Sequence, residues 1–231
     1  MTRIEEFKTH LKSGEKIFLE EYEPALNELL DNLNQEGLLK TNFTLERVTR
    51  LQKFIMSSNA ANHLFNNANK IFAEGDIEEF NSNTRKLEEL GLKVDTIGHQ
   101  YITIMCHAYQ VSSERLKLHL VTLIDFPSLG LSDADKKPLG PLIEKLQLKY
   151  PQNKFIQYLN TKIRNAVTHY SYFFENQVLN LCDGYFDPNP ITIQIDDFMK
   201  ESKKLNILTE AFFIIFLDKH RPGNDLILDI S

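Results

Sequence analysis

Apolar residues recur at steps of three and four along most of the chain, the spacing of amphipathic α-helices. The first stretch, 3–36, carries them at Ile4, Phe7, Leu11, Phe18, Ala25, Leu29 and Leu33. Within it, Gly14 and Pro24 are expected to break or kink the helix, and Gly37 to stop it. Further helices are predicted over 44–74, 76–91, 97–126, 141–150, 153–182 and 196–218. The pattern therefore predicts a mainly α fold, a multi-helix bundle.

One run departs from this period. Residues 191–195, ITIQI, alternate β-branched side chains as a strand does. The tail DLILDIS is a candidate second strand beside it, so the sequence predicts at most a small two-stranded ribbon. The segment GLKVDTIG at 91–98 is the expected boundary between an N-terminal helical region, 1–92, whose role stays open, and a C-terminal helical domain, 97–220. A tail, 221–231, follows.

Composition narrows the classes of protein. With 26 Lys and Arg against 32 Asp and Glu, the net charge is −6, which excludes a globally basic nucleic-acid binder but not a local basic patch. Only two cysteines are present, which suggests a reducing compartment. The N-terminus is too charged for a secretory signal, and the most apolar window, 205–217, is too short and polar to span a bilayer. We expect a cytoplasmic protein with no membrane partner.

Most familiar enzyme motifs are missing from the sequence. It contains no Gly-rich phosphate loop, no H-E-x-x-H, no C-x-x-C and no G-x-S-x-G. Cys106 and His107 are sequence neighbours, so on a helix their side chains diverge and do not converge on a metal. We expect neither a cofactor nor a metal site.

One constellation survives, in KIRNAVTHY at 162–170. Arg164 supplies a permanent cation whose planar fork matches phosphate oxygens. His169 is the side chain type that transfers protons near neutral pH. Together they suffice to break a phosphodiester without a metal. A five-residue step on a helix is about 140° of rotation, so Arg164 and His169 do not share a face, whereas Asn165 and His169 do. Convergence therefore needs a long Arg reach, a helix distortion or a second subunit.

The run R-N-A-V-T-H resembles the R-x4–6-H signature of HEPN domains, in which Asn, Asp or His is preferred after the Arg. The resemblance covers about 97–220. It implies an α-helical domain, a metal-independent endoribonuclease activity and a homodimer in which both motifs face a shared cleft. It further implies that Arg164 and His169 are catalytic and that Asn165 orients His169 or the backbone near it. Several members are toxins or antiviral defence proteins that accompany a nucleotidyltransferase-like antitoxin.

Secondary candidates surround the motif. Many HEPN members carry a polar Glu/Lys pair in the preceding helix, to which Glu114 and Lys117 could correspond, although their spacing of three differs from the commoner four. Lys154 and Lys162 belong to a locally basic run that is either an RNA-binding strip or a solvated face. Tyr170 opens an aromatic cluster that is either a core or dimer-interface stripe, the favoured interpretation, or a surface for stacking on bases.

Two functions from different classes follow. The leading hypothesis is a HEPN-type ribonuclease or RNase-like effector that uses the ribose 2′-hydroxyl for transesterification. The alternative is a non-catalytic helical module for protein interaction or nucleotide binding, in which Arg164 and His169 are ordinary residues and Arg164 is salt-bridged nearby.

Overall fold

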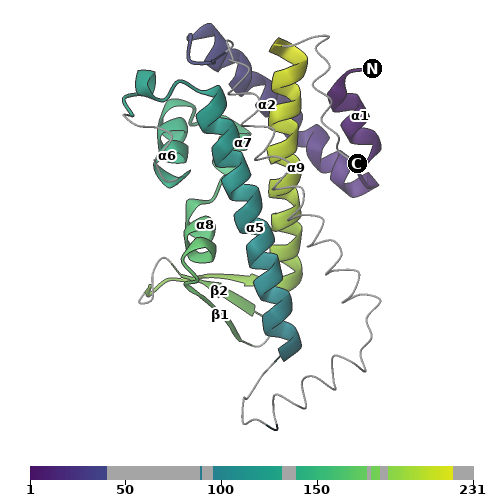
Figure 1. Cartoon of the computed structure of the whole chain (residues 1–231), viewed down its shortest axis with the longest axis vertical. Coiled ribbons are helices and arrows are strands. Elements are labelled where there is room, and N and C mark those ends of the chain that lie inside the picture. Colours follow the sequence, from purple (N-terminus) through teal and green to yellow (C-terminus); the bar gives the residue numbers. More distant parts are fainter. Residues whose placement is uncertain (41–88, 90–95, 132–138, 176–177, 183–186, 221–231) are drawn as a thin grey trace. The chain divides into compact units, whose positions relative to one another are not determined.

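The computed structural model describes residues 1–40, 89, 96–131, 139–175, 178–182 and 187–220 (Figure 1). In this part of the chain the fold is mainly helical, with a small three-stranded antiparallel sheet towards its C-terminal side. The helices are α1 (Arg3–Thr9), α2 (Ser13–Gln35), α5 (Thr96–Leu123), η1 (Pro127–Leu129), α6 (Leu139–Lys149), α7 (Lys154–Tyr158), α8 (Thr161–Thr168) and α9 (Ile195–His220). None of the described helices is long and apolar enough to cross a membrane.

The described elements fall into two compact units, and the long helices α5 and α9 contribute to both. The first unit contains α1, α2, η1, α6 and α7, with α5 from Leu116 onward and α9 from Lys204 onward. The second contains α5 up to Arg115, α8, the sheet, and α9 up to Lys203. The predicted boundary at 91–98 lies mostly outside the described residues, as do the predicted helices at 44–74 and most of 76–91.

Apolar packing forms the core of the first unit. The inner face of α2 buries Leu19, Leu26, Leu29, Leu30 and Leu33 completely. Phe155 of α7 stacks on Phe212 of α9 with ring centroids 5.8 Å apart. Pro24 lies inside α2 without ending it, while the helix stops before Gly37, which adopts φ +68°, as expected for a glycine at that position.

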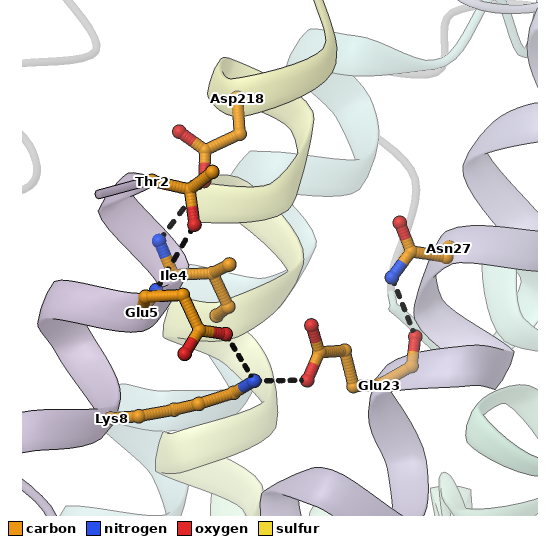
Figure 2. A network of polar contacts seen from close by, with 7 residues as sticks. All are labelled: Thr2, Ile4, Glu5, Lys8, Glu23, Asn27 and Asp218. Carbon is orange, nitrogen blue, oxygen red and sulfur yellow. Dashed lines mark hydrogen bonds and ion pairs between the residues drawn. The ribbon is translucent and has the colours of Figure 1, made fainter.

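Charged groups fasten α1 to the rest of its unit (Figure 2). The Asp218 carboxylate of α9 accepts hydrogen bonds from the backbone N–H groups of Arg3 and Ile4, so it satisfies donors that the helix itself leaves unpaired. Lys8 is 8% exposed and lies 2.6 Å from Glu5 Oε1 and 2.7 Å from Glu23 Oε2. The short helix is therefore held by ion pairs as well as by its buried Ile4.

The sheet lies in the second unit. β1 (Tyr172–Glu175) pairs antiparallel with β2 (Val178–Leu181), which pairs antiparallel with β3 (Ile191–Gln194). Leu179 and Leu181, on one face of β2, are completely buried. In the same unit Tyr109 of α5 stacks on Phe198 of α9 at 5.6 Å between ring centroids. The sheet is thus a packed part of the core. Its third strand and this packing give it a stability that an isolated two-stranded ribbon would lack.

The predicted long helix over 153–182 is wrong. The structure has two short helices there, α7 and α8, followed by β1 and β2. Asn153 caps α7 by accepting a hydrogen bond from the Ile156 N–H at 3.2 Å, so a new helix starts where continuity was expected. The strand at 191–195 is confirmed as β3, but its partner is β2. The tail proposed as its partner lies outside the described residues.

Candidate functional site

Helix α8 carries the first part of the Arg–His motif. Its apolar face buries Ile163, Ala166 and Val167, and Arg164 is buried with them at 9% exposure. The helix ends at Thr168, so His169 is the first residue beyond it. The helix predicted over 153–182 would have placed the motif midway along it, and this is wrong: the motif lies at the end of a short helix.

The backbone reversal after His169 has a defined geometry. Tyr170 adopts a left-handed conformation with φ 55°, and its N–H donates to the Val167 carbonyl at 3.4 Å. The N–H of Ser171 donates to the Ala166 carbonyl at 2.9 Å. This pair of bonds is the Schellman pattern that closes many helices, with Tyr170 at the position where glycine is usual. His169 consequently occupies the C-cap.

The sheet fixes where this reversal occurs. Ser171 and Cys182 are joined by two hydrogen bonds. In the first, the Cys182 N–H donates to the Ser171 carbonyl at 2.8 Å. The Ser171 hydroxyl donates back to the Cys182 carbonyl at 2.8 Å. Ser171, just after α8, is thus bonded to Cys182, just after β2 and eleven residues further along the chain. Continuing the helix through Ser171 would break these bonds.

Arg164 is held by a carboxylate from the preceding long helix. Its Nη2 donates to Glu114 Oε1 of α5 at 2.7 Å, and the two side chains are 10% and 43% exposed. Its Nη1 donates to Asn165 Oδ1 at 3.3 Å. Its Nε is buried and has no hydrogen-bond partner in the structure. A nearly buried cation is therefore oriented by one half-exposed carboxylate and keeps unused donors.

Asn165 contacts both ends of the motif, Arg164 through its side chain and His169 through its backbone. Its side-chain oxygen accepts from Arg164, while its backbone carbonyl accepts from the His169 N–H at 2.9 Å. The resemblance implied that Asn165 orients His169 or the backbone near it. In the structure the link to His169 runs through the backbone, and the side chain contacts Arg164.

His169 is exposed, in contrast to Arg164. This difference agrees with the five-residue step, which turns the two positions to different sides of the helix. The structure therefore brings Glu114, Arg164 and Asn165 into one hydrogen-bonded group, whereas His169 is linked to it only through its backbone N–H. An exposed imidazole is reachable by a substrate from solvent, as an acid or base must be.

The two lysines expected to bind RNA both have anionic partners. Lys162 forms an ion pair with Asp187 at 2.8 Å and also donates to the Asn189 carbonyl. Lys154, in the first unit, pairs with Glu21 and lies 4.6 Å from the centroid of the Tyr22 ring. Lys117 of α5 is half-buried. The charges of Lys154 and Lys162 are thus compensated within the chain.

A polar cluster beside the site was missed by the sequence analysis. The Tyr172 hydroxyl is hydrogen-bonded to the side chains of Thr103 and Cys106 of α5. Burial raises the pKa of the Cys106 thiol to about 12, although the bond to Tyr172 opposes this, so the thiol stays protonated and unreactive at neutral pH. Burial, with Cys106, likewise raises the pKa of Tyr172 to about 12. The run of three aromatic residues at 172–174 was the available signal.

Among the described residues, no three His, Cys, Asp or Glu side chains gather into a group able to hold a metal ion. Comparison with known proteins adds no identification: no family model, no curated protein and no solved structure matches the chain.

Proposed function

We propose that the chain is a metal-independent endoribonuclease of HEPN type in which His169 transfers the proton and Arg164 binds the phosphate. The observation that carries the proposal is that one motif supplies a guanidinium oriented by Glu114 and an exposed imidazole five residues further on, at the helix end. Because the two side chains lie on different sides of the helix end, their joint action on one phosphate requires the second subunit that the resemblance implies. The signature motif resembling HEPN domains supports the same assignment.

The reaction needs only these groups and the RNA itself. His169, in its neutral form, takes the proton from a ribose 2′-hydroxyl, and the 2′-oxygen attacks the adjacent phosphorus. The bond from phosphorus to the 5′-oxygen breaks, and that oxygen receives a proton from the imidazolium of His169. The products are a 2′,3′-cyclic phosphate and a 5′-hydroxyl. The Arg164 guanidinium stabilises the charge that develops on the phosphoryl oxygens.

Glu114 is the positioning residue in this scheme. It contacts the guanidinium and not the substrate, and it holds a cation whose side chain is 10% exposed. Fixed orientation is what makes a charged donor effective, since no reorganisation is then needed during the reaction. A homodimer with two motifs at one cleft, and a nucleotidyltransferase-like antitoxin as partner, belong to the same proposal and rest on the resemblance alone.

The test is cleavage of single-stranded RNA in the presence of chelator. The wild-type chain is expected to release fragments that end in 2′,3′-cyclic phosphate, and His169→Ala to lose at least about 100-fold in rate. The matched control is His107→Ala, because His107 is also exposed and lies on α5 in the same unit. Equal cleavage by the wild type and His169→Ala would refute the assignment.

The alternative is the non-catalytic module, in which the Glu114–Arg164 pair is only structural. It predicts no cleavage by any variant. It also predicts that expression of the wild type and of Arg164→Ala is equally harmless to the host cell.

A further inference from the structure

Tyr170 combines a strained backbone with an exposed side chain. Its backbone adopts φ 55°, where a side chain other than glycine is strained, and its side chain is 66% exposed. A buried aromatic would recover the cost of strain through apolar contacts, but a ring exposed to this extent recovers little. Strained residues of this kind cluster at functional sites.

The neighbouring ring of Tyr172 is anchored. It lies 6.5 Å from Tyr170 between centroids, with 36° between the ring planes, and its hydroxyl is bound to Thr103 and Cys106. Tyr170 is therefore an exposed ring beside a fixed one. Phe173 is also exposed, at 51%, but strand alternation directs it to the opposite side from Tyr172.

We propose that Tyr170 is a stacking surface for a base of single-stranded RNA, next to the linkage that His169 acts on. This rests on the proposed function, because the position of the surface follows from the adjacency of Tyr170 to His169. A flat aromatic ring gains stacking energy from any base. The substrate class is accordingly single-stranded RNA with an unpaired base beside the cleaved linkage, since a base inside a duplex is not free to stack on the protein.

The test measures binding and cleavage separately. Binding is followed by fluorescence anisotropy with a labelled single-stranded oligonucleotide whose sugars are all 2′-deoxy, so it is not cleaved. Tyr170→Gly is the main variant, because glycine accepts φ 55° and removes the ring without disturbing the reversal. We expect its affinity to fall about 5- to 150-fold, the range for loss of one base–aromatic stack. Tyr170→Phe should bind like the wild type, and so should Phe173→Ala.

The outcomes separate this inference from the proposed function. Binding that depends on Tyr170, without RNA cleavage by the wild type, would uphold the stacking surface and refute the ribonuclease. Cleavage that requires His169, with unchanged binding in Tyr170→Gly, would uphold the ribonuclease and refute the stacking surface. A change of oligomeric state in Tyr170→Gly, seen by light scattering without any loss of affinity, would instead assign the ring to a protein interface and overturn the inference.

Discussion

Removing either partner of the Glu114–Arg164 pair should have unequal effects on stability. The guanidinium side is 10% exposed and the carboxylate side 43% exposed, with 2.7 Å between Nη2 and Oε1. In Glu114→Ala the cation is left in a nearly buried position with an Nε that already lacks a partner. In Arg164→Met the carboxylate that remains is accessible to water, and the apolar stem is largely preserved.

The magnitudes follow from these exposures. An uncompensated buried charge costs about 3 kcal/mol, whereas an exposed ion pair contributes at most about 1 kcal/mol. We therefore expect Glu114→Ala to lower the free energy of unfolding by about 2 kcal/mol more than Arg164→Met does. If the site were an ordinary surface pair, both losses would be small and equal.

Urea denaturation of the two variants, followed by far-UV circular dichroism, measures the difference through the transition midpoint. Lys200→Met is the control, because Lys200 forms an exposed ion pair with Asp197 on α9 in the same unit and should leave the midpoint unchanged. An Arg164→Met variant that is as unstable as Glu114→Ala, or less stable, would refute the reasoning.

Three further predictions concern the helix end and two titrating groups. The Tyr170→Gly variant should be more stable than Tyr170→Ala by about 1 kcal/mol, because both lack the ring and only glycine relieves the left-handed strain. Thermal denaturation tests this, since Tyr170→Gly should have the higher midpoint. Burial tends to lower the pKa of Lys8, but its hydrogen bonds to Glu23 and Glu5 raise it above its ordinary 10.5. The stability of the wild type should therefore fall as the pH rises above that value, and Lys8→Met should lack this fall in melts between about pH 10 and 12. Burial and the charge of Lys219 lower the pKa of His220 below 6.5, against the opposing effect of Asp31. The stability of the wild type should therefore fall as the pH drops below 6.5. A His220→Asn variant whose stability depends on acid pH in the same way as that of the wild type would contradict this.

The long helices were predictable from the sequence because their periodicity is sustained. α5 was expected over 97–126 and spans Thr96–Leu123, and α9 was expected over 196–218 and spans Ile195–His220. The end of α2 was signalled by Gly37, whose positive φ no other residue adopts as easily. These features depend on local sequence alone.

The end of α8 was not predictable in this way. The reversal is made at Tyr170, a residue type that gives no signal for a left-handed conformation, and it is stabilised by bonds between Ser171 and Cys182. Ser171 and Cys182 stand next to the pair Tyr172 and Leu181 in the register of β1 and β2, so these bonds depend on strand pairing and not on local sequence. The apolar residues of 172–181 therefore fitted a continued helix as well as two strands.

The candidate site was predictable in its residues but not in its geometry. The sequence pattern selected Arg164, Asn165 and His169, and the resemblance suggested Glu114. That Glu114 reaches Arg164 across 50 positions of sequence follows from tertiary packing, as does the burial of the guanidinium. The ion pair between Lys162 and Asp187 is likewise a contact that the local basic run could not reveal.

The ribonuclease assignment is decided by the chemistry of the RNA ends after incubation with the purified chain in chelator. We predict fragments with 2′,3′-cyclic phosphate and 5′-hydroxyl ends, formed by the wild type and His107→Ala but not by His169→Ala. Intact RNA with the wild type, or the same fragments from His169→Ala, would contradict it.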